Sequence, residues 1–192
     1  MKSFGFLESG LKKDDLIYSS PVKVNIPASY SLPVQAPVYD QGSHGSCVSC
    51  SLAEGYYWFM KNQMKDWKPD YEFVYRERAD KTVDGMMPRE AYEILRRKGL
   101  IQVFARIPNL ETLKESIIVN GAALIGLIAK SDSETFWKGT DVLGGHAVAV
   151  TGFNSTGFEV KNSWGTNWGR SGYTVLPYED FSYVREAWTI LA

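Results

Sequence analysis

The chain has 192 residues, of which 44% are hydrophobic and 22% are charged, a balance typical of folded globular proteins. Lys and Arg number 21 against 22 Asp and Glu, so the formal net charge is −1. This disfavours a basic surface for nucleic acid or for a membrane. Two Cys that lie three positions apart exclude a disulfide-stapled scaffold, and two His leave two candidates for a catalytic imidazole.

The amino-terminal segment shows no targeting signal. Residues 1–7 are mildly apolar, but charged residues follow from Glu8 onward, whereas a secretory signal needs a longer apolar run. The longest apolar run, residues 122–129, has the length of a strand and is far short of the roughly 18 residues of a membrane span. We therefore expect a cytoplasmic or otherwise intracellular protein with no membrane partner, associated with a host cell or virion if it is viral.

The periodicity changes from helical to strand-like along the chain. Residues 1–24 are expected to form an extension, and residues 25–46 are broken by Pro and Gly into a loop. Apolar residues at helical spacing then predict a helix over residues 47–62 with Ser46 as its N-cap. Three further helices are predicted over residues 71–79, 89–98 and 110–120.

Short apolar or alternating runs separated by turn residues follow. They predict strands over residues 122–129, 146–153, 158–162, 173–176 and 187–191. Helices first and strands later indicate an α+β protein. We expect a mainly helical lobe over residues 25–108 and a mainly β lobe over residues 109–192.

Three segments carry residues suited to nucleophilic catalysis. Residues 39–50, YDQGSHGSCVSC, place Cys47 after a Gly-rich loop at a helix start, where the helix dipole favours the reactive thiolate. Residues 144–150, GGHAVAV, place His146 at the start of a buried strand. Residues 160–173, VKNSWGTNWGRSGY, place Asn162 at a strand end before a Trp- and Gly-rich loop. Together they offer a nucleophile, a base and an orienting amide.

These segments resemble those of papain-like cysteine peptidases, and the resemblance extends from about residue 26 to the end of the chain. It implies a two-lobe fold, with a helical lobe, an antiparallel β-barrel-like lobe and an active-site cleft between them. It assigns Cys47, His146 and Asn162 as the catalytic residues and Gln41 as an oxyanion-hole residue. Trp164 is expected to shield the Asn–His hydrogen bond. The chain ends and short head are similar to those of compact microbial and viral members.

Several features depart from the family pattern. The position three before the nucleophile, usually a disulfide Cys, is His44, and the aromatic that usually follows the nucleophile is Val48. The nucleophile and base lie 146 − 47 = 99 residues apart, against roughly 130 in well-known members. The family also binds substrate backbone at Gly residues of the helical lobe. Residues 84–87, DGMM, are our candidate for that stretch. The candidate substrate-binding residues are therefore Gly85, Gly145 and Trp164.

Two other constellations compete for the same cysteines. Residues 47–50 form a C-x-x-C, the thioredoxin-like redox motif, but the strand that should precede it is a Pro- and Gly-rich loop. His44, Cys47, Cys50 and His146 form a possible zinc ligand set. However, structural zinc ligands usually come in two close pairs, and zinc would consume the nucleophile. Cys50, one helical turn after Cys47, is expected to be a core residue.

The expected activity is hydrolysis of peptide bonds in protein or peptide substrates through a Cys47 acyl-enzyme, with no metal or organic cofactor. A peptide ligase or transpeptidase would use the same residues, and a non-catalytic binding module could share the fold. The extension over residues 1–24 is too short to fold alone. We expect it either to pack on the β lobe or to lie across the cleft as an inhibitory arm.

Overall fold

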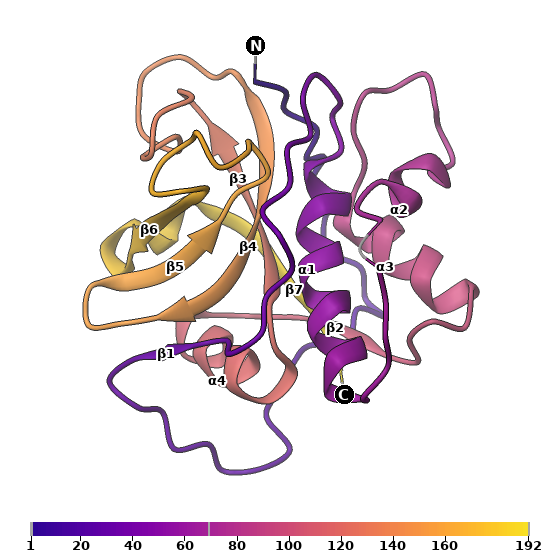
Figure 1. Ribbon diagram of the computed structural model, residues 1–192, viewed down its shortest axis with the longest axis vertical. Helices are drawn as coiled ribbons and strands as arrows, with labels where there is room; N and C mark the ends of the chain where they lie inside the picture. The colour runs from indigo at the N-terminus through magenta and orange to yellow at the C-terminus, as the bar shows by residue number, and fades with distance from the viewer. Residues whose placement is uncertain (1, 69, 192) are drawn as a thin grey trace.

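The computed structural model describes residues 2–68 and 70–191, which form two lobes side by side (Figure 1). The helical lobe contains α1 (Cys47–Asn62), α2 (Phe73–Arg76) and α3 (Pro88–Arg97). The other lobe contains an antiparallel sheet, α4 (Leu110–Asn120) and a 3-10 helix, η1 (Tyr178–Tyr183). The strands are β1 (Tyr30–Ser31), β2 (Phe104–Arg106), β3 (Ala123–Ala129), β4 (Gly144–Phe153), β5 (Gly157–Lys161), β6 (Tyr173–Pro177) and β7 (Val184–Ile190).

Helix α1 spans the residues predicted for it, but its predicted cap does not form. Ser46 occupies the N-cap position with φ −93° and ψ 14°, and its side chain makes no capping hydrogen bond. A capping hydroxyl needs an extended N-cap backbone; here the Ser46 Oγ instead lies 4.0 Å from the Sγ of Cys50. No cap side chain therefore covers the first N–H groups of α1, the turn that carries Cys47.

Helix α2 is much shorter than the predicted helix over residues 71–79. A continuing helix would pair the Tyr75 carbonyl with the Ala79 N–H. Instead the Arg78 guanidinium donates to the Tyr75 carbonyl (2.8 Å), and the Ala79 N–H donates to the Glu90 carboxylate (2.7 Å). These side-chain contacts end the helix after one turn.

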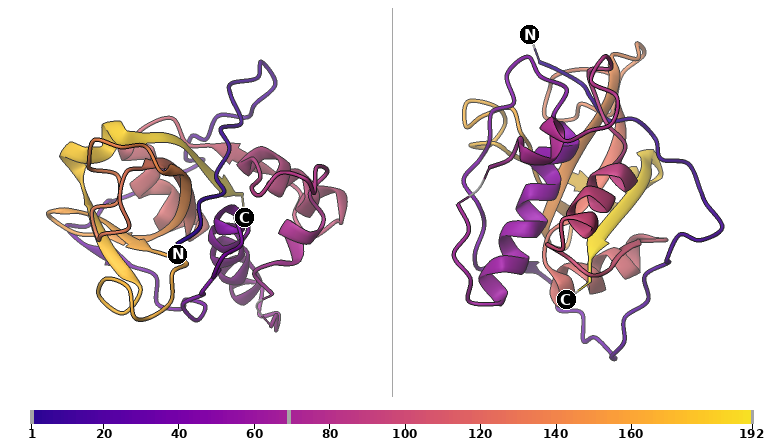
Figure 2. Two further views of the ribbon diagram at one scale, coloured as in Figure 1. Left: turned by 90° about the horizontal axis from the view of Figure 1, so that it is seen from above. Right: turned by 90° about the vertical axis from the view of Figure 1, so that its right-hand side faces the viewer.

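The sheet has the order β2-β7-β3-β4-β5-β6, all neighbours are antiparallel, and β1 pairs with β4. Viewed from above, it curls around α4 (Figure 2). Strands β1 and β2 lie within the region expected to be mainly helical, and at two and three residues they are too short to produce a periodic pattern. Through β2 and β7 the sheet reaches α3, where Trp188 packs with Tyr92.

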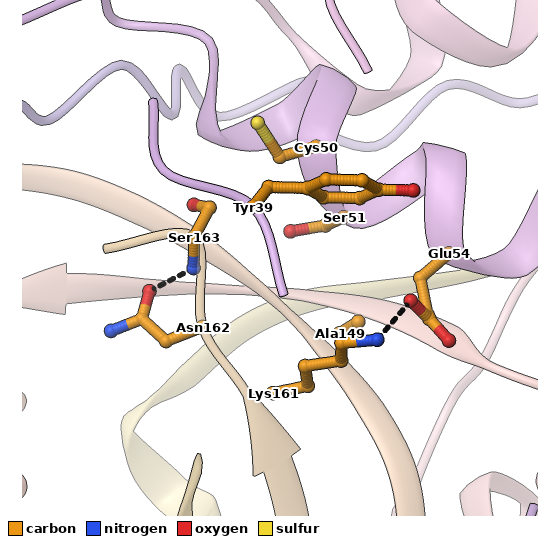
Figure 3. Close-up of a pocket in the computed structure, with 8 residues that line it drawn as sticks. All are labelled: Tyr39, Cys50, Ser51, Glu54, Ala149, Lys161, Asn162 and Ser163. Carbon is orange, nitrogen blue, oxygen red and sulfur yellow. Dashed lines mark hydrogen bonds and ion pairs between the residues drawn. The ribbon is translucent and has the colours of Figure 1, made fainter. Parts of the chain in front are cut away.

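The two lobes share a buried ion pair. Glu54 of α1 and Lys161 of β5 lie 2.6 Å apart, with side chains 2% and 3% exposed. Figure 3 shows them facing each other beside Tyr39 and Cys50. The backbone of Ala36 completes their coordination, because its N–H donates to Glu54 (3.0 Å) and its carbonyl accepts from Lys161. The pair fixes the end of β5, which the chain leaves at Asn162.

We predict that Glu54→Gln lowers the free energy of unfolding by about 3–5 kcal/mol, because it leaves the Lys161 charge buried without its partner. Urea denaturation measures the change. The double variant Glu54→Gln/Lys161→Met removes both charges and should recover much of the loss. An unchanged free energy of unfolding in Glu54→Gln would contradict a structural role for the pair.

Candidate active site

Cys47 is the first residue of α1, and its side chain is fully buried at the junction of the lobes. The backbones of Ala147 in β4 and of Gly5 in the amino-terminal segment lie close enough to the thiol to oppose the rise of its pKa. Helix α1 thus presents the sulfur to the strand that carries His146.

His146 and Asn162 form the hydrogen bond expected from the sequence. The imidazole donates from Nε2 to the Oδ1 of Asn162 (2.7 Å). The antiparallel pairing of β4 with β5 sets Ala149 opposite Lys161, the residue before Asn162. Among the described residues, the other ring nitrogen, Nδ1, has no hydrogen-bond partner. The amide therefore fixes the tautomer that leaves Nδ1 free to accept a proton.

Aromatic rings surround this hydrogen bond. The Trp164 ring, 1% exposed, stacks on the His146 ring with centroids 4.3 Å apart and an interplanar angle of 21°. Phe136 meets the imidazole edge-on at 5.2 Å, and Phe4 does so at 6.1 Å. His146 and Asn162 are both buried from water, which strengthens the electrostatic interaction of the pair.

Gln41 lies in the loop before α1, where hydrogen bonds hold both its backbone and its side chain. Its backbone N–H donates to the Ser163 carbonyl (2.9 Å), and its Oε1 accepts from the Ser163 hydroxyl (2.6 Å). Its side-chain NH₂ donates to the carbonyls of His44 (2.7 Å) and Ser3 (3.3 Å). The amide is thus firmly oriented, and one of its acceptors is a peptide carbonyl of the amino-terminal segment.

The two predicted substrate-binding glycines also contact that segment. The Gly145 carbonyl accepts from the Phe6 N–H (2.9 Å). A Cβ on Gly85 would lie 2.7 Å from the Gly5 carbonyl oxygen, and a Cβ on Gly145 would overlap the Phe6 backbone. Both positions therefore need glycine because a second backbone passes against them.

Residues 2–7, here called the arm, occupy the space between the lobes. The Met86 N–H donates to the Gly5 carbonyl (2.9 Å), and the Leu7 N–H donates to the Met86 carbonyl (3.2 Å). At the other end, Lys2 donates to the Trp164 carbonyl (2.8 Å). Seen from above, the indigo segment runs between the two lobes (Figure 2). One of the two expectations for residues 1–24 was a position across the cleft, but the individual contacts could not be predicted, because an irregular backbone has no periodicity.

The competing zinc ligand set does not converge. The His44 side chain is 61% exposed and pairs with Glu72 at 2.8 Å, whereas His146 is buried against Asn162. Cys50 packs in a small cluster with Tyr39. Both cysteines are free thiols, and within residues 2–68 and 70–191 no group of three or more potential metal-ligating side chains gathers.

Asp84 begins the stretch 84–87 that was the candidate for substrate binding, but no role was expected for its own side chain. Its carboxylate accepts from the Gly45 N–H (2.7 Å) and from the Tyr75 hydroxyl. It thus joins the loop before Cys47 to the stretch that holds the arm. The hydrogen bonds of its carboxylate could not be predicted, since the two partners lie 39 and 9 positions away.

Burial favours the neutral forms of the Cys47 thiol and the His146 imidazole. Loss of hydration raises the pKa of the Cys47 thiol to about 11, although hydrogen bonds from the backbone oppose the shift. Loss of hydration lowers the pKa of His146 to about 4, opposed by its bond to Asn162. The described state therefore does not favour a thiolate–imidazolium pair.

Comparison with known proteins places this geometry in a family. A family model described as papain family cysteine protease matches residues 38–182. The chain therefore belongs to the papain family of cysteine proteases. Within residues 2–68 and 70–191, no helix has the length and apolarity to cross a bilayer.

Individual relatives agree with this assignment. An uncharacterized peptidase C1-like protein from Acanthamoeba polyphaga mimivirus is 45% identical over 53 residues, 25% of this chain and only 17% of the viral protein. Xylellain, a cysteine protease from Xylella fastidiosa, superposes with a TM-score of 0.83 at 21% identity, over 98% of this chain and 96% of that one. Procathepsin B S9 from Trypanosoma congolense gives 0.78 at 13% identity, over 98% and 85%. At these identities the two structures show the two-lobe fold alone.

We predict that Cys47 alkylates slowly at neutral pH. In the folded chain the thiolate forms only as the pH approaches a pKa of about 11, and the thiolate is the reactive species. The measurement is the rate of iodoacetamide modification against pH, followed by intact mass in a Cys50→Ala variant so that one thiol is counted. A rate that reaches its plateau below pH 8 would show that the thiol is not buried in solution.

Proposed function

We propose that this protein is a cysteine peptidase that hydrolyses peptide bonds in protein or peptide substrates through Cys47, His146 and Asn162. The observation that carries the proposal is the hydrogen bond of 2.7 Å between His146 Nε2 and Asn162 Oδ1. His146 lies in β4 directly before Ala147, whose backbone is close to the Cys47 thiol. A binding module has no chemical need for a nucleophile, a base and an orienting amide at one junction.

In the proposed reaction His146 takes the proton of Cys47 at Nδ1, and the thiolate attacks the substrate carbonyl carbon. The side-chain NH₂ of Gln41 and the N–H of Cys47 donate to the oxyanion that forms. His146 then protonates the leaving amine, which departs and leaves an acyl-enzyme. Water deprotonated by His146 hydrolyses the thioester and restores the thiol.

We further propose that the arm inhibits this reaction. It covers the thiol at Gly5 and occupies the Gln41 amide with the Ser3 carbonyl. Its exclusion of water is one cause of the raised pKa of Cys47 and the lowered pKa of His146. Departure of the arm would rehydrate the pair and let it ionise.

The direction of the arm explains why it would not be cut. The leaving amine must lie on the His146 side of Cys47, so a productive substrate runs from the Gly85 side toward Trp164. The arm runs the opposite way, because Lys2 binds at Trp164 and the later Leu7 binds at Met86.

We predict that a peptidyl epoxide directed at cysteine peptidases adds once to the chain during prolonged incubation, because Cys47 is the activated nucleophile. Intact mass spectrometry reads the adduct. Cys47→Ala should abolish it, and His146→Ala should slow its formation by about 10²-fold or more, the usual contribution of a general base. Cys50→Ala is the matched control and should keep the adduct. Labelling that depends on Cys50 instead would contradict the assignment.

We predict that Gly5→Ala in the full chain speeds this labelling. The added Cβ would overlap the Gly45 carbonyl, so the arm could not stay in its place, while no residue of the catalytic set is altered. Lys13→Ala, an exposed change in the same extension, is the control and should leave the rate unchanged. Equal rates for Gly5→Ala and the parent chain would argue against inhibition by the arm.

A further inference from the structure

The amino-terminal extension is held a second time outside the cleft, by buried charged side chains of three elements. Arg89 lies in α3, Arg106 ends β2 and Glu186 lies in β7. We call these three residues the anchoring cluster. Their side chains are only 7%, 10% and 2% exposed. None of them belongs to the cleft described above.

Asp15 is the residue of the extension that enters this cluster. Its carboxylate accepts two hydrogen bonds from Arg89, from Nε (2.9 Å) and from Nη2 (2.6 Å). A third comes from Nε of Arg106 (2.9 Å). The Asp15 side chain is 6% exposed. Paired bonds from the planar guanidinium of Arg89 make this a geometrically specific carboxylate site.

The cluster also binds the backbone that leads to the arm. Arg89 donates to the carbonyls of Ser9 (2.6 Å) and Gly10 (2.6 Å), and Arg106 donates to the Gly10 carbonyl as well. In return, the Ser9 N–H donates to Glu186 (2.7 Å). Only Glu8 separates these contacts from the end of the arm, so the two sites are joined by a very short tether.

Charge balance makes Asp15 the fitting occupant. The anchoring cluster contains two guanidinium groups and one carboxylate, and Arg106 and Glu186 pair at 2.8 Å. Asp15 provides the second negative charge, and buried charges are tolerated when paired in this way. Burial alone would raise the pKa of Asp15, but the Arg89 hydrogen bonds, a hydrogen bond from the Lys12 N–H (3.0 Å) and the two guanidinium charges outweigh it and lower the pKa to about 2.

We propose that the anchoring cluster is a binding site for the Asp15 carboxylate and that this contact keeps the arm over Cys47. The inference rests on the proposed inhibitory role of the arm. Six residues in a cleft make few contacts on their own, but a fixed attachment a few residues away keeps their effective concentration high. Loss of the Asp15 contact leaves the arm tethered but lets it leave the cleft more often.

The test compares rates of peptidyl-epoxide labelling in full-length chains. Asp15→Asn keeps the shape of the side chain and removes its charge, and it should raise the labelling rate at least ~10-fold. Asp14→Asn removes a charge from the neighbouring, exposed position and should have no effect. Arg89→Lys keeps the buried charge but loses the planar fork, so it should also raise the rate. It provides the same test if Asp15→Asn does not fold.

The outcomes separate the two proposals. If Gly5→Ala speeds labelling but folded Asp15→Asn or Arg89→Lys does not, the anchoring site is wrong and inhibition by the arm stands. If Gly5→Ala does not speed labelling, inhibition by the arm is wrong. A purely structural role for Asp15 would lower the thermal midpoint without raising the labelling rate, and that result also overturns the proposal.

Discussion

The site depends on the packing of the first turn of α1 against β4. Nothing in the chain itself brings Cys47 near His146, because they lie 99 positions apart. They come together because α1 begins beside β4, with the Cys47 thiol close to the backbone of Ala147, the residue after His146. The buried Glu54–Lys161 pair joins α1 to β5, the strand next to β4. It holds the end of β5, from which Asn162 reaches His146.

If the arm inhibits a Cys47 peptidase as proposed, its place in the cleft accounts for the neutral forms that burial favours at Cys47 and His146. Backbone contacts at Gly145 and Met86, together with aromatic packing of Phe4 on His146, seal the junction from water. Sealing raises the pKa of Cys47 and lowers that of His146. The His146–Asn162 geometry and the neutral forms of Cys47 and His146 are therefore compatible, since the proposed cause of the neutral forms is a segment that can leave the cleft.

The sequence predicted the parts of the structure that are local. Helices α1 and α4 span the expected residues because their apolar spacing and their ends are encoded within each segment. The predicted helix over residues 71–79 was wrong after Arg76, since Arg78 and the distant Glu90 take the backbone groups that the helix needed. Side-chain competition of this kind leaves no periodic signal.

In the candidate site, too, the residues of local motifs could be predicted, and the contacts between distant segments could not. Cys47, His146 and Asn162 could be proposed because each lies in a motif resembling a known family. A position across the cleft was one of the two expectations for residues 1–24, but the individual contacts of the arm could not be predicted, because it binds mainly through its backbone and carries no motif. Asp15 was likewise hidden, since its partners Arg89 and Arg106 lie 74 and 91 positions away and come together only in the fold.

Amide hydrogen exchange of the unmodified full-length chain tests the central claim, that the protein's own arm fills the cleft, most directly. The Phe6 and Leu7 N–H groups donate to Gly145 and Met86, so the account predicts that both exchange far more slowly than free-chain amides. Exchange of both at free-chain rates, while amides of α1 and β4 remain protected, would contradict it.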